Sequence, residues 1–310
     1  MNVPFSDLKL LHRELKQELM EEIGKIIDNA SFILGDAVSD FEKGFAELCA
    51  AKYCAGVSSG TDANHIALWA KGIGPGDEVL IPANTFIATA WGATLCGAKP
   101  VFADCEPDSM NIDPSDAERR ITGATKAAVA VHLYGQTADM DRLKEVCSAR
   151  NVELIEDAAQ AHLAEYKGAR AGSLADTASF SFYPGKNLGA LGEAGALTTS
   201  DEDLNRKFRM LRDLGSDAKY YHRTLGHNYR MEGIQGAALK IKLKYLVKWT
   251  NERRSAAAYY DSALKEIEQV TLPVQMPYAK HVYHLYVIRT PQRDELMKHL
   301  ATNGISAGLH

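Results

Sequence analysis

Two polar side chains follow runs that are predicted to be strands, and their types suit the chemistry of a reactive amine. Asp157 closes the apolar run VELIED, and Lys186 follows ASFSFYPG, directly after a Pro-Gly turn. Ligands of open α/β sheets bind at the carboxyl ends of the strands. A lysine there can form a Schiff base with a carbonyl compound, and an acid can pair with a cationic ring nitrogen. The alternatives are that Asp157 caps a helix and that Lys186 is an ordinary surface lysine.

A third segment, SSGTDANHIALWA, is typical of an anion site at a helix N-terminus. Gly60 allows a close turn, and the amides of Thr61 and Asp62 would point toward a phosphate. Asp62 could instead be only an N-terminal helix charge. A lysine, an acid and a phosphate cradle together are the requirements of pyridoxal 5'-phosphate (PLP), which the sequence therefore predicts as the cofactor. Phe86, after Pro-Ala-Asn, is a candidate for stacking on the planar cofactor, with an ordinary core position as the alternative.

The elements that must position these residues follow from hydrophobic spacing. Apolar residues at helical intervals predict helices over residues 8–29 and 36–49. From residue 78 onward, short apolar runs alternate with helical stretches such as residues 139–150, which predicts an α/β fold with a mainly parallel sheet. The runs expected to form strands are EVLIPA, PVFADC, KAAVAVHLY, VELIEDAA, ASFSFYPG and EAGALTTS.

The last quarter of the chain has a different pattern of apolar and polar residues. Residues 231–264 predict one long helix, HVYHLYVIRT predicts a strand, and residues 291–303 predict a further helix. We expect a large domain over residues 1–250, followed over residues 251–310 by a linker helix and the start of a small α+β domain. Too little chain follows GISAGLH to close a sheet layer, so we expect this small domain to be incomplete.

Composition narrows the choice of partner and location. The net charge of −5 and a pI near 6.1, without a long basic run, argue against nucleic acid and anionic membranes as partners. The charged N-terminal segment does not fit a signal peptide, and no run reaches the roughly 18 apolar residues of a membrane span, so we expect a cytoplasmic protein. The five cysteines form no CxxC pair, which predicts reduced thiols and no metal site.

Six motifs, in order and spacing, resemble the DegT-type sugar aminotransferases almost from end to end: GVSSGTDA, PANTFIATA, HLYGQTADMD, IEDAAQAH, SFSFYPGKNLGALGEAGA and GHNYRMEGIQGA. These are fold type I PLP enzymes that act on nucleotide-linked keto-sugars. The resemblance implies a seven-stranded, mainly parallel sheet flanked by helices and a homodimer with shared active sites. The segment GEAGA departs from the more familiar GDGGA, which we expect to change a turn and not the cofactor chemistry.

The resemblance also assigns roles to individual residues. Lys186 would hold PLP as a Schiff base and then act as acid and base in the proton shift, while Asp157 would keep the pyridine nitrogen protonated. Gln160 would lie near the ring, and the hydroxyl of Ser181 would bind the phosphate. Asn228 would reach the phosphate of the neighbouring subunit. Arg230 is the second candidate for that role, and both could instead be ordinary turn or surface residues. The residues that would line the sugar pocket are Tyr183 and His310.

The SFYPGKNLGALG and HLYGQTADMD motifs are similar to enzymes that aminate carbon 3 of a dTDP-linked 3-keto-6-deoxyhexose. L-Glutamate is the expected amino donor. The alternatives are a keto-cyclitol aminotransferase, a synthase of an amino-aromatic acid, and a non-catalytic regulatory relative that keeps the PLP fold. Family members continue beyond the point that corresponds to His310, so we expect an incomplete substrate pocket in this chain.

Overall fold

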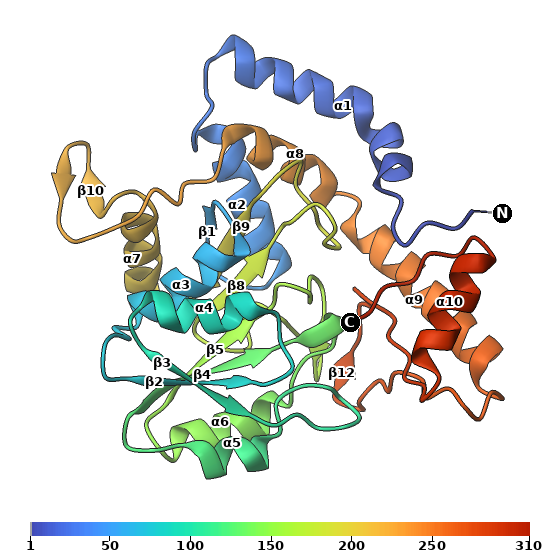
Figure 1. Ribbon diagram of the computed structural model, residues 1–310. Coiled ribbons are helices and arrows are strands. Elements are labelled where there is room, and N and C mark those ends of the chain that lie inside the picture. Colours follow the sequence, from blue (N-terminus) through green and yellow to red (C-terminus); the bar gives the residue numbers. More distant parts are fainter. Residues whose placement is uncertain (1) are drawn as a thin grey trace.

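A seven-stranded sheet forms the centre of the computed structural model, which describes residues 2–310 (Figure 1). Its order is β1-β9-β8-β5-β4-β2-β3, and β9 runs antiparallel to both β1 and β8 while the other neighbours are parallel. The prediction of a seven-stranded, mainly parallel sheet is confirmed. The strands are β1 (Tyr53–Val57), β2 (Glu78–Pro82), β3 (Lys99–Ala103), β4 (Thr125–Val131), β5 (Glu153–Asp157), β8 (Ala178–Ser181) and β9 (Gly195–Thr199).

Helices cover both faces of the sheet, which is why its central strands are nearly continuous apolar runs. One face packs against α2 (Asp36–Leu48), α5 (Pro114–Arg120), α6 (Met140–Ser148) and α8 (Gly233–Leu243). The other packs against α3 (Gly60–Ala70), α4 (Ile87–Leu95) and α7 (Glu202–Arg212). The six predicted strands and the helix of residues 36–49 are confirmed, while β1 was not among the predicted strands.

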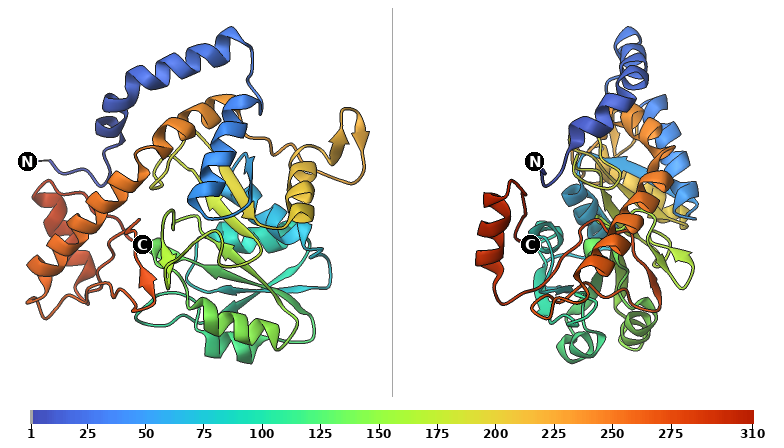
Figure 2. Two further views of the ribbon diagram at one scale, coloured as in Figure 1. Left: turned by 180° about the vertical axis from the view of Figure 1, so that it is seen from behind. Right: turned by 90° about the vertical axis from the view of Figure 1, so that its right-hand side faces the viewer.

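The helix α1 (Leu8–Asp28) lies outside these two layers and packs across α8 (Figure 2). A small separate apolar cluster joins the two helices through Leu15 and Leu19 of α1 and Ala238 and Ile241 of α8. On another side of the molecule, the hairpin of β10 (Ser216–Ala218) and β11 (Tyr221–His222) projects from the end of α7 (Figure 1).

The prediction of one helix over residues 231–264 is wrong, because α8 ends at Leu243 and α9 (Leu246–Leu264) begins three residues later. No proline or glycine marks this break. The amides of Lys244 and Tyr245 instead bond three residues back, which tightens the last turn. The break lets Tyr245 and Trp249 pack against the α1 cluster, a contact that helical spacing could not reveal.

The strand predicted for HVYHLYVIRT is also wrong, since residues 281–288 carry no strand assignment. Val282 and Leu285 donate backbone hydrogen bonds to Gly135 and Tyr134, in the turn η1 (Leu133–Gly135) that follows β4. Just before this segment, β12 (Ala279–Lys280) pairs with β6 (Glu165–Tyr166), which in turn pairs with β7 (Ala169–Arg170). This part of the chain therefore packs onto the large domain, beside the end of β5.

The predicted helix at residues 291–303 is confirmed as α10 (Arg293–Thr302). The boundary that we expected at residue 250 falls inside α9, which is continuous across it. The division into residues 1–250 and 251–310 stays a prediction.

Candidate active site

Lys186 lies in a closed turn that follows β8. Its backbone amide donates to the carbonyl of Tyr183 at 2.8 Å, and the amide of Ala190 donates to Phe182 at 2.7 Å. The lysine residue is half-buried in this turn, near the end of β5. Burial lowers the pKa of the Lys186 ammonium, and the charge of Asp157 acts in the opposite direction. An amine with a lowered pKa is a better nucleophile near neutral pH than a surface lysine.

Asp157 ends β5 and is held by three donors. Its Oδ2 accepts from Asn64 Nδ2 at 2.9 Å and from Thr89 Oγ1 at 2.8 Å, while Oδ1 accepts from the Ala159 amide at 3.2 Å. The hydroxyl of Ser179 donates to Asn64 Oδ1 at 2.5 Å and so orients that amide. The carboxylate is buried, and these donors fix its position at the end of β5.

The partners of Asp157 were absent from the sequence candidates. Asn64 and Thr89 are buried polar residues inside α3 and α4, whose other inward positions are almost all apolar. A polar side chain in such a helix must find a hydrogen-bond partner when buried. This pattern could have identified both residues as part of a polar site.

Glu156, the neighbour of Asp157, has a structural role on the opposite face of the strand. Its carboxylate accepts from the amides of Gly172, Leu174 and Ala175 at 2.7–2.9 Å and lies 3.0 Å from His132 Nε2. The Ala138 amide donates to His132 Nδ1, so the ring proton lies on Nε2. Four donors satisfy this fully buried carboxylate and anchor the end of β5.

The residues predicted to form the phosphate cradle meet where β8 approaches the first turn of α3. A Cβ atom on Gly60 would lie 2.5 Å from Ser181 Cβ, so a residue without a side chain is needed for this approach. One amide is not as we expected: the Asp62 amide donates to Ser59 Oγ, the helix cap, at 3.1 Å. No described residue accepts from the Thr61 amide, which remains available to an anion together with the Ser181 hydroxyl.

Two further candidates lie around the turn after β4. Gln160 Oε1 accepts from the Tyr134 amide at 2.6 Å, and the ring of His310 packs edge-on against the Tyr134 ring with centroids 5.0 Å apart. Burial, and then the charge of Lys186, lower the pKa of His310. His310 thus lies close enough to Lys186 to feel its charge, and Gln160 binds the same turn through Tyr134. Tyr183, on the Lys186 turn itself, is exposed.

Of the remaining candidates, Phe86 and Asn228 are exposed and Arg230 is half-buried. Phe86 is 67% exposed at the N-cap of α4, so the alternative of a core position is wrong, while its stacking role stays a prediction. Arg230 forms an ion pair with Asp213 at 2.5 Å. Asn228 pairs with Asp213 through the backbone, and its exposed side chain has no hydrogen bond to the described residues.

The residues present fit PLP. Lys186 can take the aldehyde, the carboxylate of Asp157 is available to the ring nitrogen, and the Gly60–Ser181 approach leaves an amide and a hydroxyl for the phosphate. Within residues 2–310, no group of three or more His, Cys, Asp or Glu side chains is placed to hold a metal ion. The same residues include no helix with the length and apolarity that a membrane span requires.

Comparison with known proteins agrees with this geometry. The dTDP-3-amino-3,4,6-trideoxy-α-D-glucose transaminase of Streptomyces venezuelae is 44% identical over 99% of this chain and 81% of its own length. A pleiotropic regulatory protein of Geobacillus stearothermophilus is also 44% identical, over 99% of this chain and 83% of that protein.

Two solved structures are also similar to this chain. The crystal structure of S. venezuelae DesV in complex with a ketimine intermediate has a TM-score of 0.96 and 44% identity, over 98% of this chain and 82% of that chain. The structure of NtdA from Bacillus subtilis with bound cofactor PMP has a TM-score of 0.91 and 31% identity, over 98% of this chain and 71% of that one. These likenesses confirm the fold type I architecture.

The model of the DegT/DnrJ/EryC1/StrS aminotransferase family matches residues 13–310. A family match over nearly the whole chain, together with the lysine, the acid and the phosphate cradle, makes the assignment plain. The chain belongs to the DegT/DnrJ/EryC1/StrS aminotransferase family, and it is a PLP-dependent aminotransferase.

Proposed function

We propose that this aminotransferase moves an amino group onto carbon 3 of a dTDP-linked 3-keto-6-deoxyhexose, with L-glutamate as the amino donor. The observation that carries the proposal is that Lys186, whose pKa is lowered by burial, lies near the buried and hydrogen-bonded carboxylate of Asp157, in a chain 44% identical to a 3-amino-sugar transaminase. A purely regulatory protein has no chemical need for this pair. The sugar, the nucleotide and the donor are the proposed parts of the function.

The chain's own residues would divide the work. PLP, when bound, supplies a cationic ring that accepts electrons from a bond at the substrate carbon. Lys186 Nζ moves the proton between that carbon and the cofactor, because its amine becomes free beside the substrate. Asp157 holds the proton on the ring nitrogen. Thr61 N–H and the Ser181 hydroxyl orient the cofactor through its phosphate.

The first test is the visible absorbance spectrum of the purified holoenzyme before and after addition of L-glutamate, with Lys186→Ala as control. We expect a visible band that glutamate bleaches and that the control does not show. Turnover of a dTDP-3-keto-sugar is then compared with turnover of a keto-cyclitol. A faster keto-cyclitol reaction would refute the proposed substrate, and an intact spectrum without turnover of any ketone would favour a regulatory role.

We also propose a homodimer whose subunits share their active sites. The α4 helix and the residue before it expose an apolar stripe that a monomeric protein would rarely leave in water: Phe86, Ile87, Trp91 and Leu95. A second copy over this stripe would enclose Phe86, the stacking candidate, and could bring its Asn228 to the phosphate. The five free cysteines support a cytoplasmic location.

Mixed dimers test the shared site. Chains with Lys186→Ala and chains with Asn228→Ala are each expected to be impaired alone. If Asn228 acts across the interface, mixing and exchange of subunits creates one site with both native residues and restores part of the activity. Absence of any recovery, with exchange verified by mass, would place Asn228 in its own subunit's site.

A further inference from the structure

The structure buries a lysine that the proposed chemistry does not use. Lys242 of α8 is 2% exposed, and no carboxylate lies within ion-pair distance of it among the described residues. Its Nζ donates to the carbonyl of Gly189 at 2.6 Å and lies 2.9 Å from His12 Nε2. Burial lowers the pKa of Lys242 to about 8. A buried ammonium of this kind is costly, and its contacts show what it holds.

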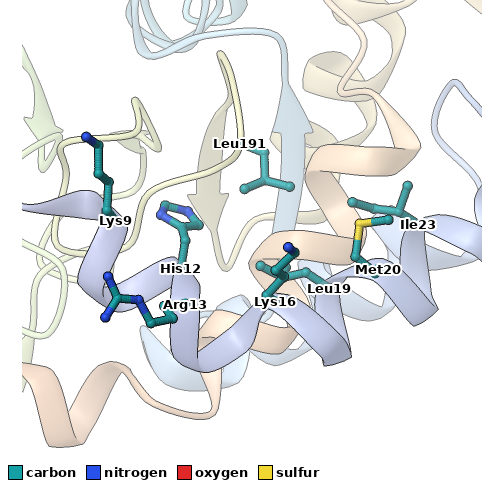
Figure 3. Close-up of a pocket in the computed structure, with 8 residues that line it drawn as sticks. All are labelled: Lys9, His12, Arg13, Lys16, Leu19, Met20, Ile23 and Leu191. Atoms are coloured by element: carbon teal, nitrogen blue, oxygen red, sulfur yellow. The ribbon is translucent and has the colours of Figure 1, made fainter.

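The contact with His12 has a defined direction. His12 Nδ1 lies 2.7 Å from the carbonyl of Leu8, which can only accept, so the ring proton is on Nδ1. Nε2 is then the acceptor for Lys242. Figure 3 shows the His12 ring on the side of α1 that faces the segment carrying Leu191, two residues beyond Gly189. Lys242 therefore bridges α1 and the end of the Lys186 turn.

Gly189 is a tight point of that turn. A Cβ atom there would lie 2.3 Å from the carbonyl oxygen of Pro184, so the two ends of the turn touch. On its other side the turn is held by Asn187, whose Nδ2 donates to the Val282 carbonyl at 3.3 Å. A shift of the Gly189 carbonyl would thus be transmitted across a closed loop of six residues to Lys186.

We propose that Lys242 is a positioning residue for the cofactor lysine: its ammonium holds the Gly189 carbonyl, and through His12 it couples the seating of α1 to the geometry of the Lys186 turn. The inference rests on Lys186 as the cofactor lysine and on no particular sugar. A displacement of a reacting group by about 1 Å can lower a rate by roughly 100-fold, so such support is relevant to catalysis.

The test uses the holoenzyme with Lys242→Met, which keeps the aliphatic length and removes the donor. Lys240→Met is the matched control, because Lys240 lies on the same helix and pairs with Asp40 at the surface. We expect amide hydrogen exchange of Lys186 and Ala190 to accelerate, and kcat to fall about 10-fold or more with little change in KM. Thermal unfolding should match the control or move upward, because a buried charge is removed.

Two results would overturn the proposal. One is unchanged exchange at residues 183–190 in Lys242→Met with kcat equal to that of Lys240→Met. The other is a lower unfolding midpoint with all core amides exchanging faster together, which is the signature of a general structural role. The hydrogen-exchange measurement needs no substrate. It therefore still tests the role of Lys242 if the proposed sugar proves to be wrong.

The proposed coupling through His12 is tested separately. His12→Phe should loosen the Lys186 turn, His12→Gln should restore it because an amide oxygen can accept from Lys242, and Lys242→Met should add little on top of His12→Phe. If the exchange of residues 183–190 in His12→Phe matches the wild type, α1 is not coupled to the turn.

Discussion

Replacement of Gly60 by alanine adds one methyl group at the contact between α3 and β8 on which the proposed phosphate site depends. The new Cβ would lie 2.5 Å from Ser181 Cβ and 3.1 Å from Ser181 Cα. Ordinary carbon–carbon contacts are about 3.5–4.0 Å, so about 1 Å must be absorbed by the first turn of α3 or by the end of β8. Either movement separates the Thr61 amide from the Ser181 hydroxyl.

The expected size follows from this overlap. Overpacking of a well-packed contact costs roughly 1–3 kcal/mol. The Thr61 amide and the Ser181 hydroxyl must meet one phosphate in the cofactor-bound state. If the overpacking cost falls mainly on that state, the Kd for PLP rises by about 5- to 140-fold, at 1.4 kcal/mol per factor of ten.

The assay is titration of the apoenzyme with PLP, followed by absorbance, with thermal unfolding of the apoenzyme measured in parallel. Gly74→Ala is the control, because no atom lies within 4 Å of a Cβ there and the position follows the same helix. A Gly60→Ala protein that binds PLP as tightly as the control would refute the cradle. If the free energy of unfolding of the apoenzyme falls by the full overpacking cost, the substitution destabilises the fold and not the bound cofactor.

Two other substitutions probe the buried polar groups. Asn64→Leu removes a donor to Asp157. Because hydrogen bonds to charged groups contribute about 1.5–3 kcal/mol, PLP should bind this variant about 10-fold more weakly or worse. An unchanged Kd for PLP would contradict the role of Asn64. His162 is buried with both ring nitrogens unpartnered, and burial lowers its pKa to about 3. In the unfolded chain His162 takes up a proton below about pH 6.5, whereas in the folded chain it does not until about pH 3. The contribution of neutral His162 to the free energy of unfolding is therefore fully present above about pH 6.5 and is lost as the pH falls toward 3. His162→Phe should therefore remove about 2 kcal/mol of the fall in unfolding free energy between pH 7 and pH 5, measured by urea denaturation; an identical slope in both proteins would contradict this.

The local sequence was sufficient for the strands and for the residues at their ends. The runs before Asp157 and Lys186 are buried on both faces of the sheet, so their apolar texture is continuous and easy to detect. Because the carboxyl ends of parallel strands share one edge, placing the acid and the lysine at strand ends also placed them together. The motif SSGTDANHIALWA separately placed Gly60 at the start of a helix.

Local spacing was less reliable where two elements compete for one segment. The break before Tyr245 has no helix-ending residue, and it exists because Tyr245 and Trp249 pack on α1, which lies more than two hundred residues earlier in the chain. The segment after β12 reads as a strand by composition, yet its backbone donors are taken by the turn at Tyr134 and Gly135.

The sequence by itself determined the cofactor and the type of sheet, and it proposed the lysine and the acid, since these depend on residue type and on short-range periodicity. Only the tertiary structure decided which side chains hold them. Asn64 and Thr89 meet Asp157 from 93 and 68 residues away, and Lys242 meets Gly189 from 53. The physical reason is that buried polar groups take whatever partner packing brings within hydrogen-bond distance, and that distance has no counterpart in the spacing of residues along the chain.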